Sequence, residues 1–71
     1  MIKLTRLNGS LIVVNADLIE YVEANPDTIL TLTTGQKILI QDTVDEVIDK
    51  VTNYKRSILR RTNQALLNNK D

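Results

Sequence analysis

The chain has 71 residues, with nine basic and nine acidic residues and therefore no net charge. A chain of this length forms one small domain and buries only about 60% of the surface that its unfolded form exposes. Because it contains no cysteine and no histidine, it has no disulfides, no thiolate or imidazole metal sites and no Ser-His or Cys-His catalytic pairs.

The core of such a domain is expected to be thin. Tyr21 and Tyr54 are the only aromatic residues, whereas each large ring typically buries about 150–250 Å². Small scaffolds without disulfides or metals are commonly stabilised by self-association, so we expect a homo-oligomer. The lack of cysteine fits a cytoplasmic protein, and no apolar run approaches the roughly 20 residues that span a bilayer. The sequence therefore predicts a soluble or peripheral protein.

Between residues 2 and 41, short runs rich in β-branched residues alternate with turn signals. Asn8-Gly9 and Thr34-Gly35 predict tight hairpins, and Asn25-Pro26-Asp27 predicts a further turn. We therefore expect antiparallel strands over residues 2–7, 11–14, 18–24, 28–33 and 36–41.

Two of these strands invite a more specific prediction. The four consecutive aliphatic residues at 11–14 indicate burial on both faces. Strand register over 18–24 would alternate the side chains between two sides, with Leu18, Val22 and Ala24 on one and Ile19 and Tyr21 on the other. A helical turn at the start of this segment, capped by Asn15 or Asp17, is the alternative, and we favour the strand.

From Thr43 onward there is no glycine or proline, and the apolar spacing changes from two to about 3.6. This pattern predicts one long helix over 43–67, opened by a capping box at Thr43-Val44-Asp45-Glu46. Its expected apolar face consists of Val44, Val47, Ile48, Val51, Tyr54, Ile58, Ala65 and Leu66. The fold class is thus α+β, a small antiparallel sheet of four to five strands (2–41) followed by this helix, in one domain over 1–67. Residues 68–71 are expected to form a disordered tail.

The predicted helix is longer than the sheet that it covers. It would measure roughly 35 Å at 1.5 Å per residue, whereas a sheet of such short strands is roughly 20 Å across. The helix should therefore extend past its own sheet by two or three turns. We expect the aliphatic residues on this extension, Ile58, Leu59 and Leu66, to contact another copy or a partner.

The charges are distributed unevenly along the chain. Residues 1–49 hold three bases and eight acids, a net charge of −5, and residues 50–71 hold six bases and one acid, a net charge of +5. Such asymmetry predicts a charged binding surface or a head-to-tail contact with another copy. The candidate partner-binding residues are Lys55, Arg56, Arg60 and Arg61. They would meet an acidic protein surface or anionic lipid headgroups, although a solvated helix face would have the same composition.

Little in the sequence points to chemistry, and we expect no catalytic, cofactor-binding or metal-binding residues. The acids at 42, 45, 46 and 49 could suggest a Mg²⁺ or Ca²⁺ cluster, but they lack the glycine and the ligand spacing of an EF-hand. Negative charge at a helix start explains all four. A small enzyme that uses carboxylates and Mg²⁺ is thus one alternative to a binding protein. A regulatory module that binds nucleic acid through the basic helix is another alternative. The neutral net charge argues against it, and so does the lack of aromatic platforms for bases beyond the two tyrosines.

Several segments together resemble the short flagellar FlbD family, also called SwrD. They are Met1–Gly9 (MIKLTRLNG), Asn15–Glu20 (NADLIE), Pro26–Thr28 (PDT), Leu30–Leu32 with Gly35, and Val44–Ile48 (VDEVI). The resemblance covers about residues 1–55. It implies a role in bacterial flagellar and swarming motility by supporting motor power, in the context of the membrane-embedded stator made of MotA and MotB. It also implies a non-enzymatic protein without catalytic residues, free in the cytoplasm or peripheral at the inner face of the cell membrane near the motor.

Overall fold

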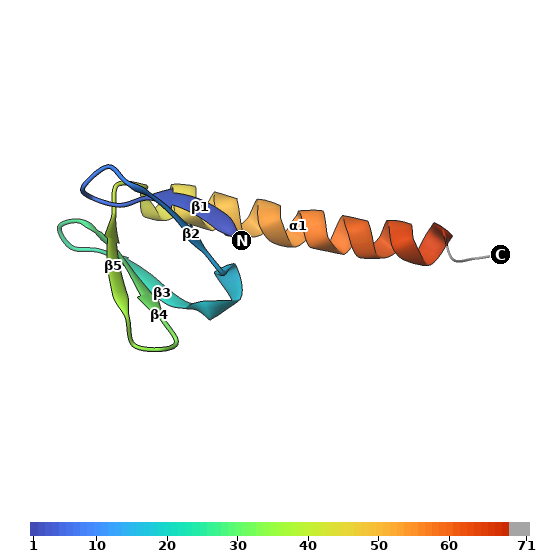
Figure 1. Ribbon diagram of the computed structural model, residues 1–71, viewed down its shortest axis with the longest axis horizontal. Coiled ribbons are helices and arrows are strands. Elements are labelled where there is room, and N and C mark those ends of the chain that lie inside the picture. Colours follow the sequence, from blue (N-terminus) through green and yellow to red (C-terminus); the bar gives the residue numbers. More distant parts are fainter. Residues whose placement is uncertain (69–71) are drawn as a thin grey trace.

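The computed structural model describes the backbone of residues 1–68 and the side chains of residues 1–60. Over these residues, short antiparallel strands precede one long helix, which confirms the α+β class (Figure 1). The elements are β1 (Ile2–Thr5), β2 (Leu11–Val14), the 3-10 helix η1 (Ala16–Leu18), β3 (Ile19–Ala24), β4 (Thr28–Leu32), β5 (Lys37–Ile40) and α1 (Val44–Asn68). Asn68, which we assigned to the tail, belongs to α1, and residues 69–71 lie outside the described part.

The strands form two sheets where we expected one. β1 pairs with β2, and β3, β4 and β5 form a three-stranded sheet in that order. An isolated bridge between Arg6 and Ile40 joins the sheets, and the Gln41 amide donates to the Thr5 carbonyl at 2.8 Å. This junction places the end of β1 beside the chain that leads into α1.

Both predicted hairpins are confirmed by glycines at positive φ. Gly9 and Gly35 each have φ of 92°, a conformation that residues with a Cβ rarely adopt. The Gly9 amide donates to the Arg6 carbonyl, and the Gly35 amide donates to the Leu32 carbonyl, each at 2.9 Å. The first strand is therefore shorter than we expected, because the turn around residues 6–10 begins just after Thr5.

The prediction that β2 is buried on both faces is wrong. Leu11 is 74% exposed and Val13 is 56% exposed, whereas Val14 is buried. The β1–β2 sheet covers the core with one face only, so alternate residues of β2 point outward. Four aliphatics in a row are thus no proof of two-sided burial in so small a domain.

Residues 15–24 combine both of the alternatives that the sequence left open. The Asp17 amide donates to Asn15 Oδ1 at 3.1 Å and so caps η1, after which β3 begins at Ile19. An irregularity in the pairing between Ile19 and Tyr21 shifts the register. As a result Ile19 packs against the core while Tyr21 is 51% exposed, so our expectation that they share a side is wrong.

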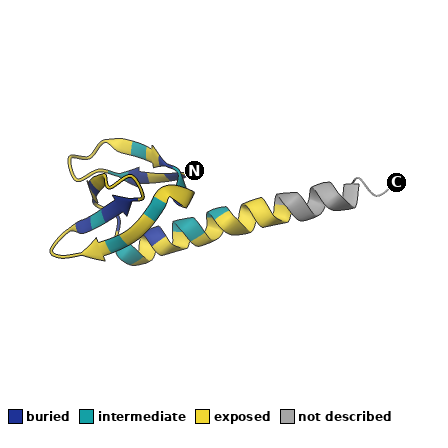
Figure 2. Ribbon diagram, turned by 90° about the horizontal axis from the view of Figure 1, so that it is seen from below, coloured by how far each residue is buried: buried dark blue, intermediate teal, exposed yellow. Residues whose placement is uncertain are grey.

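The core lies where the inner faces of the two sheets meet the first turns of α1. Leu4, Leu30, Ile40 and Val47 are the largest side chains that are fully buried. Val44, Val51 and Tyr54 are half-buried, and every described side chain from Lys55 to Arg60 is exposed. The molecule accordingly measures 53 Å along its long axis but only 22 and 19 Å across, because α1 projects far past the sheets (Figures 1 and 2).

One member of the expected apolar face of α1 differs from the prediction. Ile48 is 53% exposed, because it lies about 100° around the helix from Val47, which is the residue that faces the core. Ile58 is 42% exposed, as expected for a residue on the part of α1 that extends past the sheets. The side chains of Ala65 and Leu66 lie outside the described residues.

Candidate functional site

Helix α1 begins with the predicted capping box. The Glu46 amide donates to Thr43 Oγ1 at 3.1 Å, and the Thr43 amide donates to Glu46 Oε1 at 3.0 Å. These reciprocal bonds satisfy two amides that would otherwise have no acceptor inside the helix. Glu46 therefore has a structural role.

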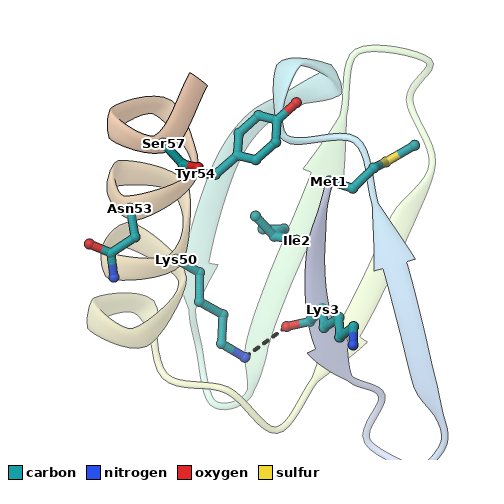
Figure 3. Close-up of a pocket in the computed structure, with 7 residues that line it drawn as sticks. All are labelled: Met1, Ile2, Lys3, Lys50, Asn53, Tyr54 and Ser57. Atoms are coloured by element: carbon teal, nitrogen blue, oxygen red, sulfur yellow. Dashed lines mark hydrogen bonds between the residues drawn. The ribbon is translucent and has the colours of Figure 1, made fainter. Parts of the chain in front are cut away.

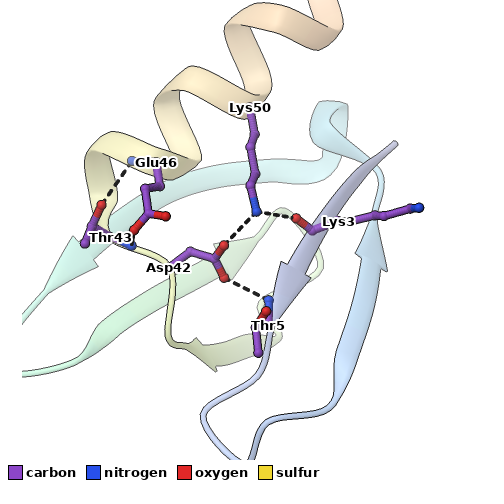
Figure 4. Close-up of polar contacts among 6 residues, drawn as sticks. All are labelled: Lys3, Thr5, Asp42, Thr43, Glu46 and Lys50. Atoms are coloured by element: carbon purple, nitrogen blue, oxygen red, sulfur yellow. Dashed lines mark hydrogen bonds and ion pairs between the residues drawn. The ribbon is translucent and has the colours of Figure 1, made fainter.

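Next to the cap, Asp42 ties the helix to the first strand (Figure 4). The Thr5 amide donates to Asp42 Oδ1 at 2.8 Å, and the Lys50 ammonium donates to Asp42 Oδ2 at 2.7 Å. The same ammonium donates to the Lys3 carbonyl at 2.7 Å. We call Asp42, Lys50 and these two backbone groups of β1 the clasp. It fixes the direction in which α1 leaves the domain.

The clasp also shifts the acidity of Asp42, whose side chain is only 7% exposed. Burial by itself would raise the pKa of this carboxyl. The hydrogen bond from Lys50, the Thr5 amide and the positive charge of Lys50 together outweigh the effect of burial, so the pKa lies below its ordinary value of 3.8. Asp42 is thus held in its charged form, which is the form that the clasp needs.

The four acids that might suggest a metal site are divided among different tasks. Asp42 belongs to the clasp and Glu46 to the cap, whereas Asp45 and Asp49 are exposed on the helix. No three acids in the described part of the chain come together in a group that could hold a metal ion. The sequence did not indicate the clasp, although Asp42 and Lys50 are eight residues apart, which is about two helical turns.

The predicted partner-binding residues lie on the projecting part of α1. Lys55, Arg56 and Arg60 are exposed. Among the described side chains the one ion pair is Lys50 with Asp42, so these three cations have no acidic partner within the described chain. Arg56 and Arg60 are one helical turn apart and share a side of the helix. The side chain of Arg61 lies outside the described residues.

The predicted oligomer contacts point in two directions. Ile58 continues the side of α1 that carries Val51 and Tyr54 toward the core, whereas Leu59, 64% exposed, continues the side that carries Ile48. The side chain of Leu66 is outside the described part. The sequence did not indicate that Ile48 is a surface residue, because the 3.6-residue spacing places it on the apolar face equally well.

An open groove of about 500 Å³ lies where α1 leaves the sheets (Figure 3). β1 and the residue before it line one side, and α1 lines the other; the lining residues are Met1, Ile2, Lys3, Lys50, Asn53, Tyr54 and Ser57. Its surface is mostly apolar and no carboxylate lines it. The groove therefore offers room for an apolar group but no acid–base pair.

The tyrosines bear on the nucleic-acid alternative. Tyr54 packs against the core, and Tyr21, which is exposed, lies on β3. Neither ring stands on the exposed turn of α1 that carries Arg56 and Arg60, where a base-stacking platform would be needed. The described residues around these cations, 55–60, thus include no ring on which a base could stack.

Comparison with known proteins is consistent with the resemblance noted above. The model of the FlbD family, described as flagellar and swarming motility proteins, matches residues 1–59, which includes the first cations of the projecting helix. Neither curated proteins nor solved structures yield a significant match. No helix in the described part of the chain is both long enough and apolar enough to cross a membrane.

Proposed function

The chain belongs to the FlbD family of flagellar and swarming motility proteins, and on this premise we propose that it supports the power of the flagellar motor as a non-enzymatic accessory of the stator. It would act through protein–protein contacts on the cytoplasmic side of the membrane. The family match supports the motility role, and the arrangement of residues supports the mode of action.

The observation that carries the proposal is the exposed, projecting half of α1. A 25-residue helix is about 37 Å long, and only its first three turns pack on the sheets. The domain thus presents a projecting helix with three exposed cations, Lys55, Arg56 and Arg60. None of them forms an ion pair with an acid in the described part of the chain. Such an element suits docking against an acidic protein surface.

The remaining polar residues support binding over catalysis. Asp42, Lys50 and Glu46 are engaged in holding the helix, and the groove beside Tyr54 carries no carboxylate. The sequence supplies no histidine or cysteine as an alternative acid, base or nucleophile. The proposed action therefore requires no cofactor.

A charge reversal on the projecting helix tests the proposal. Arg56→Glu combined with Arg60→Glu should abolish swarming while leaving the cellular level and thermal unfolding of the protein unchanged, because both residues are exposed. The matched control is Lys3→Glu combined with Lys37→Glu, two exposed cations on the strands, which should swarm normally. Normal swarming by the helix variant would contradict the proposal.

A further inference from the structure

Helix α1 has a side that faces away from the core. Positions 45, 48, 49, 52, 55, 56 and 59 recur at spacings of three and four, so they line one side of the helix, and all are exposed. Val47 and Tyr54, which pack on the core, point the other way. We call this side the outer face; its residues are Asp45, Ile48, Asp49, Thr52, Lys55, Arg56 and Leu59, with Arg60 at its edge.

The charges of the outer face are ordered along the helix. Two acids, Asp45 and Asp49, lie in its first half, and two bases, Arg56 and Arg60, lie along the same edge in its second half. Each half also carries one large exposed aliphatic residue, since Ile48 is 53% and Leu59 is 64% exposed. The outer face is thus complementary to the outer face of a second helix that runs antiparallel to it.

We propose that a second copy of this chain covers the outer face, with the two α1 helices antiparallel about a two-fold axis near residue 53. In that register each complementary pair lies within one residue, about 1.5 Å, of the same level along the helix axis. By symmetry each pair occurs twice; the pairs are Asp45 with Arg60, Asp49 with Arg56, and Ile48 with Leu59.

The order of the charges selects the antiparallel arrangement. A parallel pair would place the acidic halves together and the basic halves together, which is repulsive at both ends. In an antiparallel pair, the same edge of each helix faces its counterpart, so the acids of one copy meet the bases of the other. The arrangement also lays the projecting half of each helix alongside the body-bound half of its partner, which suits a molecule 53 Å long and about 20 Å wide.

The extent of the contact sets the expected strength. From residue 45 to residue 60 the outer face is about 24 Å long, so the buried area falls below the roughly 800 Å² per partner of a standard interface. We expect a dimer that dissociates in the micromolar range and weakens with salt. The inference deepens the proposed function, on which it rests only for its biological role, by naming a second copy as the acidic partner of Arg56 and Arg60.

The first test is the mass of the purified full chain by sedimentation equilibrium between about 1 and 500 µM. The wild type should pass from monomer to dimer. Asp45→Lys with Asp49→Lys, or Arg56→Glu with Arg60→Glu, should weaken the dimer at least tenfold, and all four changes together should restore it. Lys3→Glu with Lys37→Glu, off the helix, should change nothing. A wild type that stays monomeric, or a fourfold variant that does not recover, overturns the inference.

The second test reads the direction of the helices. The chain has no cysteine, so single cysteines can be introduced at the exposed positions Ile48 and Leu59. Under mild oxidation, a mixture of Ile48→Cys and Leu59→Cys proteins should form disulfide-linked heterodimers, whereas neither variant alone should crosslink. In a parallel pair the reverse holds, because each residue then meets its own copy. Efficient crosslinking of either variant with itself would overturn the antiparallel arrangement.

Swarming assays separate this inference from the proposed function. If the fourfold variant dimerises but does not swarm, self-association is supported and the cations also meet a motor component. If every charge-reversal variant swarms normally while the masses of the purified variants change as expected, the dimer is supported and the proposed use of these cations in motility fails. Sedimentation and crosslinking therefore test the dimer independently of the result of the swarming assays.

Discussion

From the geometry of the clasp we predict that the Asp42 carboxylate contributes a large part of the free energy that holds α1 to β1. Asp42→Ala removes the acceptor of the Thr5 amide and leaves the Lys50 ammonium with only the Lys3 carbonyl. Because Asp42 is 7% exposed, the Thr5 amide loses its acceptor at a site that water reaches poorly.

The size of the effect can be worked from these contacts. A hydrogen bond to a charged group contributes about 1.5–3 kcal/mol. The Lys50 side chain is 39% exposed, so we count its ion pair at no more than about 1 kcal/mol. We therefore expect Asp42→Ala to lower the free energy of unfolding by roughly 2–3 kcal/mol. For a domain of this size that shift corresponds to roughly 10–20 °C in melting temperature.

The pH dependence follows from the lowered pKa of Asp42. A carboxyl whose folded pKa is depressed contributes stability that is present above its unfolded pKa, near 3.8, and is lost as the pH falls through the lower folded value. The free energy of unfolding should thus fall below about pH 4 in the wild type. Asp42→Asn, which keeps an oxygen that can accept from Thr5, should remove this component of the fall.

Urea unfolding followed by circular dichroism at pH 7, 5, 4 and 3 measures both effects. Asp49→Asn, a change at an exposed acid on the same helix, is the matched control and should stay within about 0.5 kcal/mol. The reasoning is refuted if Asp42→Ala costs less than about 0.5 kcal/mol, or if Asp42→Asn falls with acid as steeply as the wild type.

Three further substitutions test single features of the fold by the same urea measurement. Thr31→Val should stabilise the protein by about 1 kcal/mol, because the buried Thr31 hydroxyl has no hydrogen-bond partner among the described residues; a clear loss would contradict this. Thr43→Ala should cost about 1 kcal/mol through loss of the cap, and an unchanged urea midpoint would count against that role. Gly35→Ala should cost about 1 kcal/mol because φ is 92° there, although no atom lies within 4 Å of the added Cβ; an equally stable variant would refute the strain argument.

The strands, hairpins and helix were predictable because local chemistry determines them. Gly9 and Gly35 permit the positive φ of tight turns, and the Thr43–Glu46 pair marks where the helix begins. The capped turn after Asn15 was open as an alternative for the same reason, since an Asn side chain and the amide two residues later make a local bond.

The errors concern which neighbour covers a given side chain, and that is a tertiary property. Leu11 and Val13 look like core residues, but their sheet has nothing packed on its outer face. Ile48 fits the apolar spacing of α1 as well as Val47 does, and only the position of the sheets makes one buried and the other exposed. Asp42 and Lys50 resemble any acid and base near a helix start until β1 brings the Thr5 amide to Asp42 and the Lys3 carbonyl to Lys50.

Helix α1 depends both on local sequence signals and on tertiary contacts. Its first turns are anchored by Val47 in the core and by the clasp at Asp42, so the domain sets the direction of the whole helix. The projecting half holds that direction because a helix bends little over such a length. Contacts some 10–20 Å away along the axis therefore set the orientation of the cations on that half. A short domain with a thin core can in this way present a stiff, charged element, and under the proposed function the stability of the clasp would help to set the geometry of binding.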